Sequence, residues 1–183
     1  MLFQLFDGKG RGKSAGVNKE FRVETSSSAN SRFYYRSRDN DDGYMMNSHD
    51  ADAEAGDYIF YFKNDNATQN FVVDRIVVGA VQSVLWKVWR ATGTATGGTA
   101  IIPVNTKVGS GATASATVLG VSAISGFSTD GQLASMRTSA ANHGVFIPND
   151  SIIIPPGGAI AIEYDTGTTG IAEIMVNGFY DAA

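Results

Sequence analysis

Short apolar or alternating segments recur along this 183-residue chain, and turn-forming residues separate them. None of these segments is long enough to form the helix that crosses over between two parallel strands. The pattern therefore predicts an all-β protein, an antiparallel β-sandwich with jelly-roll or other Greek-key connectivity. We expect strands at residues 20–24, 31–36, 57–62, 71–78, 83–89, 99–104, 113–119, 145–147, 151–154, 159–164 and 171–180.

Two stretches between these strands are expected to lack regular structure. Residues 37–57 are polar and acidic, which is typical of a long loop. Residues 126–143 show no clear period, and one helical turn is expected near Gln132–Arg137. The composition suits many turns, because the chain has 21 Gly and only 17% charged residues, against the usual ~25%.

Charge is distributed unevenly along the chain. Residues 1–38 carry eight Lys or Arg and three Asp or Glu, whereas residues 39–65 carry one and eight. Residues 7–19 are rich in Gly and have no apolar period, so they cannot fold by themselves. We therefore expect an extended basic N-terminal arm, residues 1–19, and a single β-sandwich domain, residues 20–183. Such arms contact nucleic acid or an acidic protein, or remain solvated.

Sequence motifs for phosphate binding and hydrolysis are incomplete. The segment from Gly8 to Ser14 resembles a phosphate-binding loop, but Asp7 replaces its first glycine. A Ser-His-Asp triad could form only from residues distant in sequence, and no Gly-x-Ser-x-Gly motif occurs. We expect no catalytic residue and no cofactor.

Metal-binding patterns are also incomplete. An EF-hand in the acidic stretch would place Arg38 first and His49 last, and neither suits calcium. The chain has no Cys and two His, which excludes thiolate and three-His zinc sites. We expect no metal, although an irregular calcium site at Asp39, Asp41 or Asp42 remains an alternative.

The sequence contains no stretch of about 18 apolar residues, so we expect no membrane span. The apolar residues 1–6 are few, and basic residues follow them instead of preceding them. This order differs from that of a secretory signal peptide, so we expect no export by the general secretory route.

The segment 57–62 has apolar side chains on both faces. Alternation places Tyr58, Phe60 and Phe62 on one face, with Ile59 and Tyr61 on the other. Such a strand lies between two packed layers or against another subunit. In the segment 83–89, the same alternation sends one of the two Trp residues into the core and the other outward beside Lys87.

The stretch from Ala91 to Thr129 contains Lys107 as its only charged residue. Subunit interfaces are depleted in charge at their centres, so this stretch predicts an oligomer. Together with the two-sided segment 57–62, it places Tyr61, Ile101 and Val118 in the expected interface.

The second half of the chain resembles capsid decoration (cement) proteins of tailed bacteriophages, which are small jelly-roll virion proteins. The resemblance covers residues 84–180 and lies in Gly97-Gly-Thr99, Pro103-Val-Asn105, the turn Pro155-Pro-Gly-Gly158 and the ending Val176-Asn-Gly-Phe-Tyr180. It implies a homotrimer without enzymatic activity that binds the outer face of a capsid.

We therefore expect a structural protein, made in the host cytoplasm, that binds the major capsid protein lattice and stabilises the shell. Neither nucleic acid nor membrane is an expected partner. The expected contact residues are Leu2, Phe3, Leu5, Phe6, Lys9, Arg11, Lys13, Tyr61, Ile101 and Val118.

Two other functions remain open from the sequence. One is a carbohydrate- or receptor-binding β-sandwich of a phage tail fibre or spike, in which an exposed aromatic side chain would stack on a sugar. The other is an enzyme that acts on polysaccharide. It would need a carboxylate pair such as Asp150 with Glu163 or Asp165.

Overall fold

The computed structural model describes residues 41–121, 123–140, 142–148, 152–166 and 168–182, together with two short strands near the N-terminus. The chain divides into two units, Met1–Ser31 and Arg32–Ala183. In the first unit, β1 (Gln4–Phe6) pairs antiparallel with β2 (Gly12–Ser14). The expected arm therefore includes a short hairpin. The strands expected at residues 20–24 and 31–36 lie outside the described residues.

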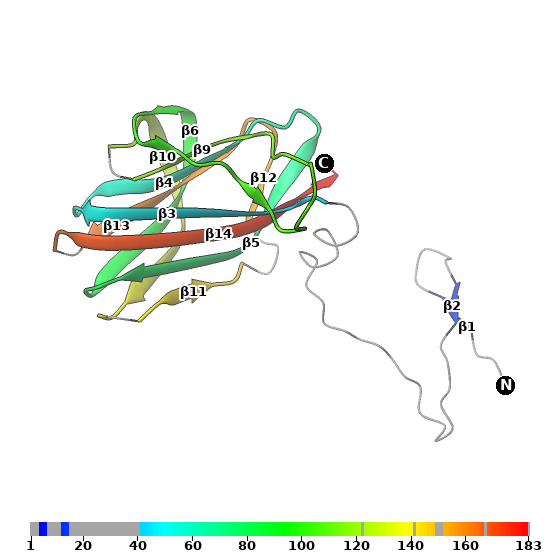
Figure 1. Ribbon diagram of the computed structural model, residues 1–183, viewed down its shortest axis with the longest axis horizontal. Coiled ribbons are helices and arrows are strands. Elements are labelled where there is room, and N and C mark those ends of the chain that lie inside the picture. Colours follow the sequence, from blue (N-terminus) through cyan, green and yellow to red (C-terminus); the bar gives the residue numbers. More distant parts are fainter. Residues whose placement is uncertain are drawn as a thin grey trace, which may run out of the picture. The chain divides into compact units, whose positions relative to one another are not determined.

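The second unit consists of two antiparallel sheets that pack face to face (Figure 1), which confirms the predicted all-β sandwich. The β6 sheet has the order β10 (Ser125–Thr138), β6 (Val84–Thr96), β13 (Ala159–Thr166), β4 (Asp57–Asn64), β9 (Ala116–Gly120) and β7 (Thr99–Ala100). The β14 sheet has the order β11 (Gly144–Phe146), β5 (Gln69–Ala80), β14 (Gly170–Ala182), β3 (Gly43–Ala53) and β8 (Val104–Asn105). The short strand β12 (Ile152–Ile154) also pairs with β5.

Aromatic side chains from both sheets fill the space between them. Phe62 of β4 contacts Phe71 of β5, with ring centroids 4.4 Å apart. Trp86 of β6 packs edge-on against Tyr164 of β13 at 5.4 Å, and its indole N–H donates to Thr138 Oγ1 over 3.0 Å. Edge-on aromatic pairs with their polar atoms satisfied stabilise a core beyond the area that they bury. The prediction that one Trp enters the core is confirmed by Trp86.

A second, smaller apolar cluster lies on the outer face of the β6 sheet. Its centre is Tyr61, whose hydroxyl donates to the carbonyl of Gly93 over 2.9 Å. Ile124 and Phe127, which follow β9 in the chain, belong to the same cluster, and the rings of Tyr61 and Phe127 lie 5.2 Å apart. The chain therefore covers the second face of β4 with its own residues.

The strict alternation expected for segment 57–62 is wrong at its start. Phe60 pairs with Ile162, but the next pair along the strand joins Tyr58 to Glu163, so the register shifts at Ile59. Ile59 consequently enters the main core with Phe60, while Tyr58 packs with the outer cluster. A β-bulge turns neighbouring side chains to faces that a period of two does not predict.

The predicted acidic loop at residues 37–57 is wrong over most of its described part, because β3 occupies Gly43–Ala53. Tyr44 and Met46 alternate into the main core, while Asn47 and His49 face outward. The strand keeps a period of two, but polar and acidic residues occupy many of its positions. Composition therefore concealed the alternation that indicates a strand.

The irregular segment expected at residues 126–143 is also wrong, because β10 spans Ser125–Thr138 and no helical turn forms at Gln132–Arg137. Its pairing with β6 shifts register three times. Phe127 packs in the outer cluster, whereas Ala134 and Met136 pack against the main core. The bulges change which side chains face the core, so the alternation along the strand changes phase and no single period runs through its sequence.

Candidate functional site

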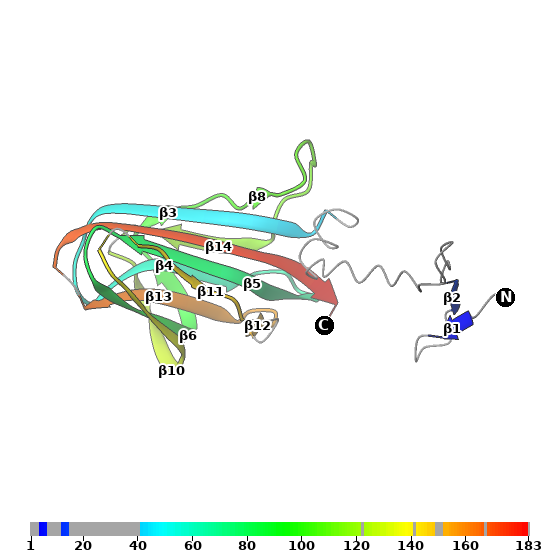
Figure 2. The ribbon, with the colours of Figure 1, turned by 90° about the horizontal axis from the view of Figure 1, so that it is seen from below.

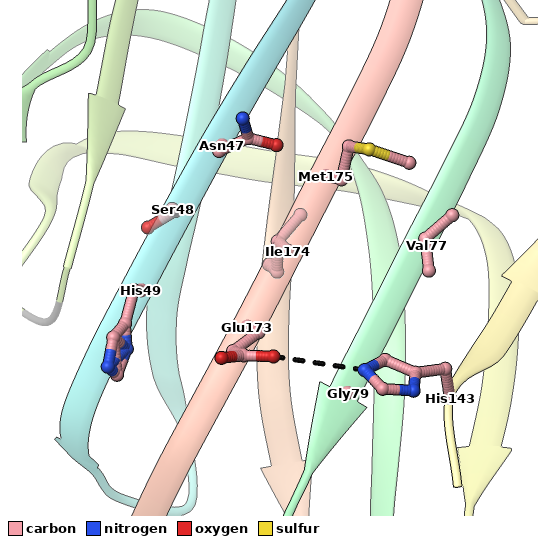
Figure 3. A pocket seen from close by; sticks show the side chains of 9 residues that line it. All are labelled: Asn47, Ser48, His49, Val77, Gly79, His143, Glu173, Ile174 and Met175. Atoms are coloured by element: carbon pink, nitrogen blue, oxygen red, sulfur yellow. Dashed lines mark ion pairs between the residues drawn. The ribbon is translucent and has the colours of Figure 1, made fainter.

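A hollow of about 390 Å³ lies on the outer face of the β14 sheet (Figure 3). Residues of β3, β5, β14 and the segment before β11 line it. They are Asn47, Ser48, His49, Val77, Gly79, His143, Glu173, Ile174 and Met175.

Strand register brings these residues into rows across the sheet. Glu173 of β14 lies opposite His49 of β3 on one side and opposite Gly79 of β5 on the other. Two residues along, Met175 lies between Asn47 and Val77 in the same way. Because alternate residues share a face, the two rows lie side by side on the outer surface, as Figure 3 shows.

Gly79 provides the space for His143. A Cβ atom at position 79 would lie 2.6 Å from the imidazole Cδ2 of His143, closer than packed atoms approach. The ring reaches this position because the next residue, Gly144, pairs with Val78 of β5. With no side chain at Gly79, the imidazole lies over β5 and faces Glu173.

His143 and Glu173 form a loose pair across the hollow. Imidazole Nε2 lies 3.8 Å from Glu173 Oε2, and both side chains are more than half exposed. That distance is too long for a direct hydrogen bond. Both groups therefore keep hydrogen-bonding capacity toward solvent or a ligand.

Together, the two rows present three kinds of hydrogen-bonding group. A carboxylate accepts, a neutral imidazole donates at one nitrogen and accepts at the other, and an amide does both. Among the described residues, no hydrogen-bond partner is found for the side chains of Asn47 and His49. In the same part of the chain, no three His, Cys, Asp or Glu side chains are grouped to hold a metal ion.

The outward Trp89 belongs to a separate polar cluster on the β6 sheet. Its indole N–H donates to Glu163 Oε2 over 2.6 Å, and Lys87 forms an ion pair with Asp165. The hydrogen bond to Asp165 raises the pKa of Lys87. Both carboxylates named as half of an enzymatic pair are thus engaged by a neighbouring side chain, and Asp150 lies outside the described residues.

An apolar projection, formed by Ile102, Val104 and Val108, follows β7 and is called the apolar hook below. These side chains are 84%, 63% and 100% exposed. Figure 2 shows the chain beyond β8 leaving the sheet and turning back toward β9. The ammonium of Lys107 lies 2.6 Å from Asp41 Oδ1, so the one charge of the charge-poor stretch is already paired.

Two of the expected interface residues are not at the surface. Tyr61 is fully buried in the outer cluster and Val118 in the main core, so the prediction that they contact a second subunit is wrong. Ile101 is half-buried against the main core, and its N–H donates to the carbonyl of Val118 over 2.9 Å. Within the charge-poor stretch, the largely exposed aliphatic side chains are those of the apolar hook.

The expected contact residues of the arm are only partly described. Leu5 and Phe6 lie in β1 and Lys13 in β2, where Leu5 pairs with Lys13. The remaining four, Leu2, Phe3, Lys9 and Arg11, lie outside the described residues.

Comparisons with protein-family models, with curated proteins and with solved structures find no match. The described residues contain no helix that is long and apolar enough to cross a membrane.

Proposed function

We propose that this protein is a non-enzymatic virion protein that self-associates and decorates the capsid of a tailed phage. The observation that carries the proposal is the apolar hook. A homotrimer, jelly-roll connectivity, the major capsid protein lattice as partner and a place on the capsid surface belong to the same proposal and come from the resemblance described above.

The apolar hook has the properties of an interface centre. Three aliphatic side chains within seven residues are largely exposed, and burying apolar area contributes roughly 25 cal/mol per Å². The pairing of Lys107 with Asp41 lowers the desolvation cost of covering this surface. Exposed aliphatic side chains this close in sequence support a protein contact, whereas single scattered ones need no such explanation.

A capsid lattice also relaxes the affinity that each contact must reach. Repeated binding sites turn later contacts of an oligomer into intramolecular events, so overall affinity exceeds that of any one contact. A small apolar hook on each subunit is then sufficient for stable binding of the oligomer to the capsid.

The first test is the oligomeric state. At about 10 μM protein, light scattering should give a mass above the 19.3 kDa of one chain. A specific interface of ordinary size keeps subunits together at such a concentration. Val108→Asp and Ile102→Asp should reduce that mass, because a charge at an interface centre is costly to bury. Val81→Asp, on an aliphatic side chain that is 56% exposed at the end of β5, is the matched control and should leave the mass unchanged.

The second test is binding to the particle. Wild-type protein should co-sediment with capsid shells purified from the phage that encodes it, and Val108→Asp should co-sediment less. A monomer that does not co-sediment would overturn the proposal. Equal loss of mass in the Val81→Asp control would show that the hook is not the contact.

A further inference from the structure

We infer that the hollow on the β14 sheet binds a neutral saccharide. This is a second binding activity, beyond capsid decoration, and it uses a surface separate from the apolar hook. It rests on the polar row His49–Glu173–His143, on the aliphatic row beside it, and on the space left by Gly79.

The polar row has the length and chemistry to bind several hydroxyl groups. Neighbouring strands lie about 4.8 Å apart, so a row across β3, β14 and β5 spans about 10 Å. Glu173 can accept from hydroxyl groups, and the imidazoles of His49 and His143 can donate or accept. A hydroxyl group does both, so one polyol can satisfy all three side chains.

The charges of the site select against ionic ligands. Of the described residues that line the hollow, Glu173 is the one carboxylate, and it would repel a phosphate or carboxylate ligand. A metal ion would need several carboxylate and imidazole ligands close together, and no three such side chains are grouped among the described residues. A neutral polyhydroxyl compound can form hydrogen bonds with Glu173, Asn47 and both imidazoles.

The second row provides an apolar surface for the C–H face of a sugar ring. Met175 and Val77 are half-buried beside the polar row, and Met adapts its shape to an irregular partner. Their neighbour Asn47 brings a further donor and acceptor to the same row. A volume of about 390 Å³ lies in the range of small-ligand sites.

The chain contains its own spectroscopic reporters for this site. It has two histidines, and both line the hollow. Titration of the full-length protein with glucose, galactose, mannose, N-acetylglucosamine, maltose and lactose should be followed through the imidazole C–H signals by NMR. At least one of these sugars, at up to about 50 mM, should shift both histidine signals along one saturable curve.

Substitutions test which groups bind. Glu173→Gln and Asn47→Ala should each weaken saccharide binding about fivefold, the change expected for one lost hydrogen bond. Glu54→Gln, at an exposed carboxylate in the turn between β3 and β4, is the matched control and should bind as the wild type does.

Three results would overturn the inference. The first is that no sugar shifts the histidine signals. The second is a linear, unsaturable shift that is the same in Glu173→Gln and Glu54→Gln. The third is a lower oligomeric mass for Glu173→Gln, which would assign the hollow to a subunit contact. Light scattering on the same samples keeps this test separate from the proposed function, because sugar binding should leave the mass unchanged.

Discussion

Gly79 and Gly178 show how a missing side chain makes room for a ring on either side of the β14 sheet. On the outer face, Gly79 leaves space for the imidazole of His143. On the inner side, a Cβ at Gly178 would lie 2.4 Å from the ring of Phe71 and 2.6 Å from the carbonyl oxygen of Val72. The same absence therefore lets an imidazole lie close to the sheet at one position and permits close core packing at the other.

Gly178→Ala should destabilise the protein by roughly 1–3 kcal/mol, the cost of overpacking a filled core. The buried ring of Phe71 and the backbone of Val72 must both move to admit the methyl group. Urea denaturation followed by circular dichroism measures the change.

Gly131→Ala is the matched control for this substitution. A Cβ at Gly131 meets no atom within 4 Å, so its effect should stay within about 0.5 kcal/mol. Equal stability of the two variants would show that Phe71 and Val72 yield without cost.

At the scale of elements, the sequence predicted regular strands well and irregular ones poorly. The strands around Trp86 and Ile160 keep a period of two and were expected near their observed places. β10 and the start of β4 contain bulges, and a bulge changes the face of a side chain without leaving a local sequence signal. The strand β3 was not predicted for another reason, because its alternation runs through polar residues.

The two candidate surfaces differed in how far the sequence could predict them. The apolar hook belongs to one continuous segment and lies within the charge-poor stretch around Lys107, but the sequence alone favoured Ile101 and Val118 there instead of the exposed residues. The hollow combines His49, Gly79, His143 and Glu173, which come from four separate segments. Only strand register brings them together, and register depends on the pairing of the whole sheet.

The side chain of Asn64 connects the ends of three strands. Asn64, fully buried at the end of β4, donates from its side-chain amide to the carbonyls of Gln69 and Ile154, over 2.8 and 2.9 Å. It thereby joins β4 to the start of β5 and the end of β12. Buried amides with satisfied partners connect elements from both sheets of the sandwich.

At the scale of the whole molecule, buried tyrosines link stability to alkaline pH. Burial raises the pKa of Tyr44, Tyr61, Tyr164 and Tyr180 above the ordinary value of about 10. Above that pH the unfolded chain loses phenolic protons that the folded chain keeps, so the free energy of unfolding falls as pH rises. The stabilisation is fully present below about pH 10.

Alkaline titration should therefore unfold the sandwich cooperatively. The ultraviolet absorbance of tyrosinate from these residues and the loss of β-sheet circular dichroism should occur in the same step, above about pH 10. Tyr61 lies in the outer cluster and the other three in the main core, so a single step also means that both clusters unfold together. Complete tyrosine ionisation in a protein that remains folded would contradict this.

The sign of the net charge differs between the N-terminal segment and the rest of the chain. Residues 1–38 carry eight basic and three acidic residues, whereas residues 39–183 carry six and fifteen. Among the described residues, those of the two apolar clusters run from Tyr44 to Tyr180. The basic segment thus has the charge to bind an acidic partner.

Deleting residues 1–19 should therefore change the melting temperature by less than about 2 °C, which corresponds to under 1 kcal/mol for a chain of this size. Co-sedimentation with capsid shells should weaken, because the deletion removes four Lys or Arg along with Leu2, Phe3, Leu5 and Phe6. Replacing Lys9, Arg11 and Lys13 by Gln tests the contribution of their charge alone. The resulting loss of co-sedimentation should become smaller as the salt concentration is raised. A fall of several degrees on deletion would make the segment part of the domain, and unchanged co-sedimentation would remove it from the capsid contact.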